Sequence, residues 1–362
     1  MLKPLRVAIK RKLGWLGVPH IVPYTAYGDR DKVLITGAVI EDKGIARPEP
    51  GQSLWKNILT MVKRYAGDEI AGVRVKIEYG GTQELVRTNE LGLFHTILPN
   101  YAPSTEEETW QPVRFTLMDE LVEDQEPVVA ESEVHIAGED ADYLVVSDID
   151  DTVMVSHSTK KLKKLRLMLL RNALTRSPFE GVAAFYRALQ HSPEGKERSI
   201  FYVSASEWNL YDLLVDFFEV KKIPRGTLLL SDAKLRIFSI FRSGGKLKEK
   251  INRIMDLFEL YYRNHFILIG DSGQKDPEIY LKITAMYPSR VKAIYIRYIG
   301  SSKRNRRLER LMAEARDLGT EMILVRTTTE AARHAVERGF IPAEGVSDIT
   351  SEKAREEKEP VP

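Results

Sequence analysis

The sequence predicts a protein of two domains, in which an antiparallel β-rich domain precedes an α/β domain built on a parallel sheet. Before about residue 138, short runs of alternating apolar and polar residues are separated by turn residues, as is typical of antiparallel strands. After residue 143, short apolar runs alternate with helical patterns, which is typical of a parallel sheet. The chain has 362 residues, enough for two hydrophobic cores.

The composition is that of a globular protein, with 43% hydrophobic and 29% charged residues. The net charge of +2, from 54 basic and 52 acidic residues, argues against bulk binding of nucleic acid. The absence of cysteine excludes disulfides, thiolate zinc sites and thiol nucleophiles. No segment approaches the roughly 18 consecutive apolar residues of a transmembrane helix. We expect a cytoplasmic protein, with peripheral membrane association as an alternative; the oligomeric state is left open.

The first 20 residues are rich in positive charge and lack the continuous apolar core and cleavage site of a signal peptide. Their basic residues are Lys3, Arg6, Lys10, Arg11 and Lys12. We expect a solvated terminus here, and a weak amphipathic surface anchor is the alternative.

Residues 21–138 are predicted to form a small antiparallel β-sandwich. One helix is expected at 54–65, where apolar residues recur at helical spacing after Ser53. Clustered carboxylates or histidines are absent from this part of the sequence, so we expect it to serve packing or partner contact. The predicted strands are 33–40, 73–79, 84–88, 93–98, 113–117 and 128–136.

Residues 143–342 form the predicted α/β domain, after a polar boundary at 138–142. The charged segment 347–362 is expected to be disordered because it holds few large apolar residues. The predicted strands are 143–147, 199–204, 227–231, 265–270, 291–297 and 321–325. The predicted helices are 160–173, 179–190, 208–219, 246–262, 277–286, 303–318 and 328–338.

The first strand of the α/β domain leads into a cluster of carboxylates. Asp148, Asp150 and Asp151 occupy three of four consecutive positions after a buried apolar run. In a parallel α/β sheet, ligands bind beyond the carboxyl ends of the strands. Neighbouring carboxylates repel one another, and a divalent cation with oxygen ligands, such as Mg²⁺, removes that cost. A solvated acidic turn is the alternative interpretation.

Two further strands of this domain also end in polar side chains. Ser204 follows one of them, and Asp271 and Asp276 follow another. Between them, the helix start at 246–250 carries three lysines. This set suits phosphoryl transfer, because a carboxylate can attack phosphorus while a cation, a lysine and a hydroxyl neutralise the charge of the phosphate.

The polar segments resemble the four motifs of the haloacid dehalogenase superfamily, in order. More narrowly, Ser147–Val153, Ser204–Tyr211 and Gly270–Tyr280 resemble the phosphatidate phosphatase family of the yeast actin-patch protein and its bacterial relatives. The resemblance covers about residues 140–342. It implies a Rossmann-like domain of the haloacid dehalogenase type, and a β-sandwich ahead of that domain also resembles the bacterial members.

The resemblance implies roles for the residues of the first two motifs. Asp148 is the expected nucleophile and a Mg²⁺ ligand. Asp150 is the expected general acid and base, with its backbone carbonyl also on the metal. Thr152 is expected to order the loop, and Ser204 to donate a hydrogen bond to the phosphoryl group. Asp151 receives no role.

The remaining motifs supply a lysine and further carboxylates. By resemblance, Asp271 completes the metal shell, and Asp276 supports the metal or the lysine. The spacing in the family favours Lys250 as the catalytic lysine, with Lys246 and Lys248 as alternatives. A solvated helix face is the other interpretation of this lysine cluster.

The rest of the second motif is expected to lie near the substrate or to support the site. Ser206, Trp208 and Asn209 are the residues that we assign to it. Trp208 is equally compatible with the core of the following helix. The sequence departs from the family at Glu207, where the family usually has proline, and this change bears on substrate contacts.

The expected reaction is Mg²⁺-dependent hydrolysis of phosphatidate to diacylglycerol through an aspartyl-phosphate intermediate. The segment 160–176 separates basic and apolar residues onto two helix faces, which suits an anionic membrane surface or, equally, packing on the core. One alternative is the same chemistry on a soluble phosphate ester or phosphoprotein. Another is a catalytically inactive, membrane-associated binding protein.

Overall fold

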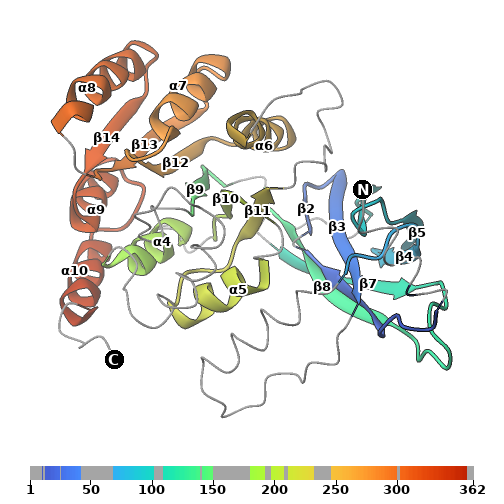
Figure 1. The fold of residues 1–362 in the computed structure, drawn as a ribbon. Coiled ribbons are helices and arrows are strands. Elements are labelled where there is room, and N and C mark those ends of the chain that lie inside the picture. Colours follow the sequence, from blue (N-terminus) through green and yellow to red (C-terminus); the bar gives the residue numbers. More distant parts are fainter. Residues whose placement is uncertain are drawn as a thin grey trace. The chain divides into compact units, whose positions relative to one another are not determined.

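The computed structural model describes residues 10, 13–24, 26–41, 68–101, 109–138, 141–149, 180–191, 197–207, 211–231, 246–299 and 302–356. The chain divides into two compact units, Met1–Thr105 with Thr109–Ala137, and Gly138–Pro362 with Glu106–Glu108. Figure 1 shows the elements of both. The helices predicted at 54–65 and 160–173 lie outside the described residues.

Eight strands lie within the described residues of the first unit, and all six strands predicted from the sequence are confirmed among them. They are β1 (Pro19–Pro23), β2 (Ala26–Gly28), β3 (Lys32–Glu41), β4 (Arg74–Tyr79), β5 (Thr82–Arg87), β6 (Leu93–Pro99), β7 (Thr109–Leu117) and β8 (Val129–Ile136). Their order is β1-β3-β2-β8-β7-β4-β5, with β6 on β3. Only β2 and β8 run parallel among the paired strands of this sheet; every other described pair is antiparallel.

The predicted two-sheet sandwich is, within the described residues, one eight-stranded sheet that curls over a single core. Phe94 on β6 and Phe115 on β7 have ring centroids 5.7 Å apart, although these strands are not hydrogen-bonded neighbours. Both side chains belong to one cluster of buried apolar residues. The sheet therefore bends far enough for β6 and β7 to cover the same hydrophobic interior.

The hairpin of β4 and β5 shows how the sequence specifies this unit. Val75, Ile77 and Tyr79 on β4 are buried, while the residues between them are not, as strict alternation requires. The turn that follows uses Gly80 and Gly81, whose φ angles are 54° and 82°. A tight hairpin turn of this kind needs positive φ at both central positions, which glycine adopts without strain.

The second unit is an α/β structure, and its described residues form a parallel sheet of six strands, as predicted. Its strands are β9 (Leu144–Asp148), β10 (Ile200–Glu207), β11 (Thr227–Ser231), β12 (Phe266–Asp271), β13 (Val291–Arg297) and β14 (Glu321–Val325). Its described helices are α4 (Val182–Gln190), α5 (Tyr211–Val220), α6 (Lys246–Leu260), α7 (Asp276–Met286), α8 (Ser302–Asp317), α9 (Thr328–Glu337) and α10 (Glu344–Glu356).

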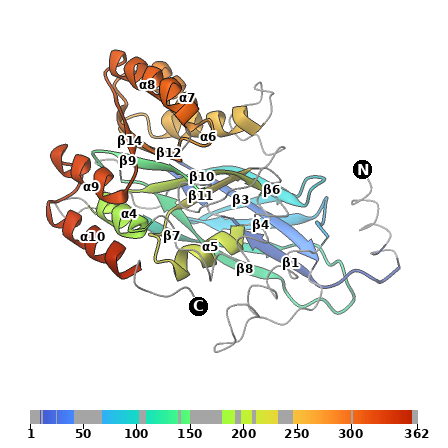
Figure 2. The same cartoon turned by 60° about the vertical axis from the view of Figure 1, so that its left-hand side comes forward.

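The strand order places the first and fourth strands of this unit side by side. The order is β11-β10-β9-β12-β13-β14. The chain moves outward from β9 in one direction, returns to β12, and then moves outward in the other. Helices α6, α7 and α8 cover one face, and α4, α9 and α10 gather on the other (Figures 1 and 2). In this doubly wound arrangement, the carboxyl ends of β9 and β12 flank the crevice where ligands bind.

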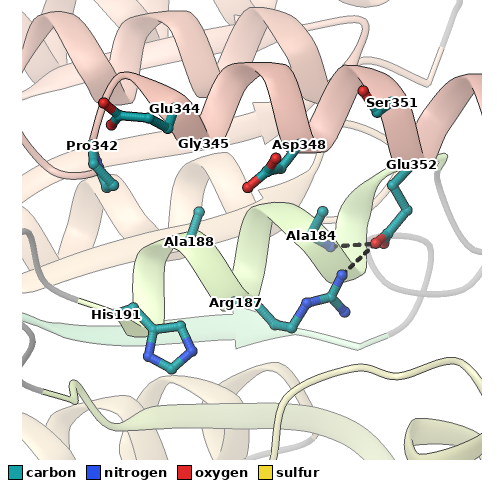
Figure 3. A pocket seen from close by; sticks show the side chains of 10 residues that line it. All are labelled: Ala184, Arg187, Ala188, His191, Pro342, Glu344, Gly345, Asp348, Ser351 and Glu352. Carbon is teal, nitrogen blue, oxygen red and sulfur yellow. Dashed lines mark hydrogen bonds and ion pairs between the residues drawn. The ribbon is translucent and has the colours of Figure 1, made fainter.

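Helix α10 corrects the prediction of disorder over 347–362, which is wrong as far as Glu356. Ile349 on this helix is fully buried. Glu352 accepts a hydrogen bond from the backbone N–H of Ala184 at 3.1 Å and pairs with Arg187 (Figure 3). Glu352 thus caps α4, whose own N-cap residue provides no side-chain acceptor. Contacts with α4 make this charged segment helical; residues 357–362 lie outside the described part.

Among the described helices, none combines the length and the hydrophobicity that crossing a membrane requires.

Candidate active site

Strands β9 and β12 are neighbours in the parallel sheet, and both end in acidic residues at its carboxyl-terminal side. Ile269 on β12 pairs with Ser147 on β9, so the next residues of each strand emerge together. Carboxylate oxygens of Asp148, Asp271 and Asp276 lie within 4.8 Å of one another, and all three residues are buried. Strand pairing therefore assembles one carboxylate cluster from two distant parts of the sequence.

Lys250 of α6 joins this cluster. Its Nζ donates hydrogen bonds to Asp148 Oδ1 at 2.6 Å and to Asp276 Oδ1 at 2.5 Å. The residue is only 6% exposed, whereas Lys248 is exposed. The side chain of Lys246 lies outside the described part of the chain. The position of Lys250 agrees with the family spacing, while its catalytic role stays a prediction.

The carboxylates keep the buried Lys250 ammonium charged. Burial alone would lower its pKa, but the charges and hydrogen bonds of Asp148 and Asp276 outweigh burial and raise the pKa above its ordinary value. The ammonium therefore remains a fixed positive charge between two carboxylates at neutral pH.

The donor set fits a divalent cation. Three carboxylates against one ammonium leave an excess of acidic groups in a buried site, and an uncompensated buried charge is costly. A divalent cation cancels this charge, and carboxylate oxygens are ligands that Mg²⁺ prefers. Asp148 and Asp271 are the expected ligands, because both carboxylate oxygens of Asp276 already accept hydrogen bonds, Oδ1 from Lys250 and Oδ2 from the N–H of Asp271.

The loop between β12 and α7 holds its two aspartates by backbone hydrogen bonds. Asp271 Oδ1 accepts from the N–H groups of Gly273 at 2.5 Å and Gln274 at 2.9 Å. Asp276 Oδ2 accepts from the N–H of Asp271 at 3.2 Å. These bonds orient both carboxylates before any ligand arrives, which lowers the cost of binding one.

Gly270 is the point at which this loop has no room for a side chain. A Cβ at this position would lie 2.6 Å from Asp276 Oδ2 and 2.8 Å from Cε2 of Tyr280. Tyr280 is fully buried, and its hydroxyl donates to the carbonyl of Ile269 at 2.8 Å, so it cannot easily move. The absence of a Cβ lets Asp276 approach the strand end.

We expect Gly270→Ala to destabilise the fold by about 1–3 kcal/mol and to lower activity at least about tenfold, because the new methyl displaces Asp276. Urea denaturation and steady-state kinetics measure both effects. Gly345→Ala is the control, since a Cβ there makes ordinary contacts at 3.5 Å. Equal stability and activity of the two variants would contradict the conclusion that a methyl at position 270 displaces Asp276.

The buried hydroxyls of Ser147 and Tyr186 form a hydrogen-bonded chain to the backbone of Asp148, which the sequence did not predict. Ser147 Oγ donates to the backbone carbonyl of Asp148 at 2.9 Å. The hydroxyl of Tyr186 on α4 lies 2.6 Å from Ser147 Oγ. Because Ser147 has only one proton, Tyr186 must be the donor. Burial raises the pKa of Tyr186 well above its usual value, so the donor stays protonated.

Arg297 at the end of β13 lies beside the acidic loop and was not among the predicted site residues. It is the strand-register partner of Asp271, and its backbone carbonyl accepts from the N–H of Ser272 at 2.9 Å. Its positive charge also acts on the hydroxyl of Tyr186. The rule that polar residues at strand ends indicate ligand sites, applied to the predicted strand 291–297, would have found it.

The other predicted site residues are described only in part. Ser204 is buried and directly follows Val203, the partner of Asp148 on β10. Ser206 lies in β10, but its side chain is not among those described. Asp150, Thr152, Trp208 and Asn209 lie outside the described residues. Their roles stay predictions.

A separate groove of about 530 Å³ lies between α4 and α10 (Figure 3). None of the predicted catalytic or metal-binding residues lines it. The residues that line it are Ala184, Arg187, Ala188, His191, Pro342, Glu344, Gly345, Asp348, Ser351 and Glu352. The candidate active site is therefore the carboxylate cluster and not this groove.

The segment that contains the acidic cluster matches a known protein family. Residues 143–298 match the family described as the catalytic domain of phosphatidate phosphatase APP1. This segment, which holds most of the parallel sheet, is therefore similar to that family. Five candidate site residues have side chains that the structure describes, and all of them lie within the matched segment: Asp148, Ser204, Lys250, Asp271 and Asp276.

Two curated relatives extend this finding. An uncharacterized protein of Schizosaccharomyces pombe is 26% identical over 268 residues, covering 72% of this chain and 41% of the relative. Phosphatidate phosphatase APP1 of Saccharomyces cerevisiae is 27% identical over 158 residues, covering 44% of this chain and 26% of the relative. The matches thus span less than half the length of either relative.

Among solved structures, a carbohydrate acetylesterase from Xanthomonas citri matches with 11% identity and a TM-score of 0.28. The match covers 83% of this chain and 75% of that protein. Such a score supports no conclusion on fold or function.

Proposed function

We propose that this protein is a phosphoric monoester hydrolase that converts phosphatidate to diacylglycerol and inorganic phosphate with Mg²⁺ as cofactor. The buried cluster of Asp148, Asp271, Asp276 and Lys250 carries this proposal, because it lies within the segment that matches the phosphatidate phosphatase family. Such a cluster offers a nucleophile, cation ligands and a fixed positive charge to one phosphate group.

In the first step, a carboxylate oxygen of Asp148 attacks the phosphorus atom. The bond between phosphorus and the ester oxygen breaks, and the alcohol leaves with a proton from Asp150, the general acid that the family resemblance implies. The product on the protein is an acyl phosphate. The hydroxyls of Ser147 and Tyr186 hold the backbone of Asp148 in position for this attack.

In the second step, water attacks the phosphorus of the acyl phosphate. Asp150 accepts the proton of that water, inorganic phosphate leaves, and the carboxylate of Asp148 is restored. Throughout, Lys250 holds Asp148 and Asp276 in place and offsets negative charge next to the phosphoryl group. Asp148 and Asp271, with the Asp150 carbonyl by resemblance, would hold a Mg²⁺ ion, which would supply further charge neutralisation for the phosphoryl oxygens.

The doubly wound sheet and the order of the motifs support assignment to the haloacid dehalogenase type. The candidate nucleophile is the last residue of β9, the first strand of the domain. The second acidic loop begins at the end of β12, the fourth strand, and the strand order reverses between these two strands. We extend the proposal to a cytoplasmic enzyme that works at the membrane surface where its substrate resides.

A substrate panel tests this function. We expect purified protein to release phosphate from phosphatidate in vesicles when Mg²⁺ is present, and to lose this activity with a chelator until Mg²⁺ is restored. Glycerol 3-phosphate, p-nitrophenyl phosphate and a phosphopeptide serve as soluble comparisons. Turnover of soluble esters alone would refute phosphatidate as the substrate. Failure on every ester with Mg²⁺ would refute the catalytic function itself.

A further inference from the structure

Three large apolar side chains project into solvent from the loop that precedes β1. Leu13 is 50% exposed, Trp15 is 72% exposed and Val18 is 58% exposed. Exposure of single apolar residues is ordinary, but three within six positions, including a tryptophan, form a concentrated apolar surface. We call residues 13–18 the tryptophan loop.

The first unit holds the tryptophan loop in place at several points. Leu16, in its middle, is 7% exposed and packs into the core cluster of that unit. The N–H of Gly17 donates to Glu41 Oε1 at 2.9 Å, and the N–H of Trp15 donates to the carbonyl of Lys10 at 2.8 Å. These contacts fix the loop with Leu16 in the core and Leu13, Trp15 and Val18 exposed to solvent.

Lys10 ties the start of the tryptophan loop to the sheet. Its Nζ bonds Glu41 at 2.6 Å and Asp68 at 2.7 Å, and both carboxylates are largely buried. Hydrogen bonds to these carboxylates raise the pKa of Lys10, so the attachment persists at neutral pH. An anchored loop displays its apolar side chains at little entropic cost.

Positively charged residues precede these apolar side chains in the sequence. Lys3, Arg6, Arg11 and Lys12 precede the loop, in addition to the paired Lys10, and the first acidic residue of the chain is Asp29. Anionic lipid surfaces attract such basic segments with about 1 kcal/mol per residue, and tryptophan favours the interface between membrane and water. Apolar insertion and basic attraction are the two signals that together give stable membrane attachment.

We propose that the tryptophan loop is a membrane-docking site that inserts Leu13, Trp15 and Val18 into the interface of an anionic bilayer. Of the two expectations from the sequence, the proposal takes the surface anchor in place of the solvated terminus. The charge of the preceding segment identifies an anionic lipid surface as the occupant. The site brings the protein to a membrane whether or not the enzyme hydrolyses a lipid there, so it stands independently of the proposed function.

Co-sedimentation of the full chain with vesicles tests the docking site. Phosphatidylcholine vesicles with and without phosphatidylserine serve as probes, since neither lipid is the proposed substrate. We expect strong binding only with phosphatidylserine, and binding at least about tenfold weaker for Leu13→Ser with Trp15→Ser. Arg11→Glu with Lys12→Glu should weaken binding similarly, and raised salt should weaken binding of the wild type.

Matched controls separate docking from folding and from catalysis. Leu85→Ser in β5 and Tyr262→Ser in the second unit remove side chains that are 56% and 60% exposed, and both variants should bind vesicles normally. Asp148→Asn should also bind normally. The loop variant should hydrolyse p-nitrophenyl phosphate at the rate of the wild type and melt at the same temperature.

Tryptophan fluorescence gives a second readout. A blue shift on adding phosphatidylserine vesicles is expected for the wild type and should be lost in Trp15→Phe. Equal binding of the loop variant and the wild type would overturn the proposal. Failure of the wild type to bind anionic vesicles would also overturn the proposal, including the case in which the loop binds a protein partner instead.

Discussion

Replacing Asp148 by asparagine is expected to lower phosphate-ester hydrolysis by about a thousandfold or more. The amide keeps the shape of the side chain, but it cannot form an acyl phosphate. It also removes one negative ligand from the cation site. Both effects act on the chemical step, so kcat should fall far more than KM changes.

The Asp148→Asn variant should remain folded. Lys250 keeps its ion pair with Asp276, and the amide oxygen can still accept the hydrogen bond from Nζ. Removing one of three clustered carboxylates also reduces their mutual repulsion. Thermal melting monitored by circular dichroism checks this point. Asp348→Asn, the same change at an exposed position of α10, is the control and should leave activity unchanged. Activity of Asp148→Asn within tenfold of the wild type would exclude Asp148 as the nucleophile.

Replacing Lys250 by methionine is expected to abolish activity and to destabilise the second unit by about 3–5 kcal/mol. Methionine fills a similar volume without charge, so the carboxylates of Asp148 and Asp276 lose the ammonium that both of them contact. Breaking a buried ion pair by removing one partner leaves an uncompensated buried charge, which accounts for the size of the effect.

Lys248→Met is the matched control for Lys250→Met, because Lys248 lies on the same helix but is exposed. It should change stability by less than about 0.5 kcal/mol and leave kcat near that of the wild type. Urea denaturation and steady-state kinetics distinguish the two variants. If Lys248→Met lost activity and Lys250→Met kept it, the assignment of the lysine would be reversed.

The strand ends of the α/β unit were predictable because burial on both faces leaves an unambiguous signal. The apolar runs before Asp148 and Asp271 belong to two central strands, which are covered by helices on both sides. Their polar ends therefore stand out in the sequence. Periodicity does not reveal which strands are neighbours, so the meeting of Asp148 and Asp271 depended on the resemblance to a family.

Residues that act through contacts distant in the sequence were harder to find. Tyr186 reads as a core residue of an amphipathic helix, and nothing nearby in the sequence links its hydroxyl to Ser147, 39 positions away. The capping role of Glu352 is invisible for the same reason, since its partners lie on α4. Composition alone therefore assigned disorder to a segment that tertiary contacts make helical.

Covalent phosphorylation of Asp148 during turnover is the step on which the proposed chemistry depends, and chemical trapping tests it most directly. The variant Asp150→Asn, in which the second step should be slow, is mixed with p-nitrophenyl phosphate, whose leaving group needs no protonation. Reduction with borohydride converts an aspartyl phosphate to homoserine, which mass spectrometry of the digested protein locates. We predict homoserine at position 148, and none when Asp148→Asn is added. Substrate turnover with an unmodified Asp148, or with the modification on another residue, would contradict the mechanism.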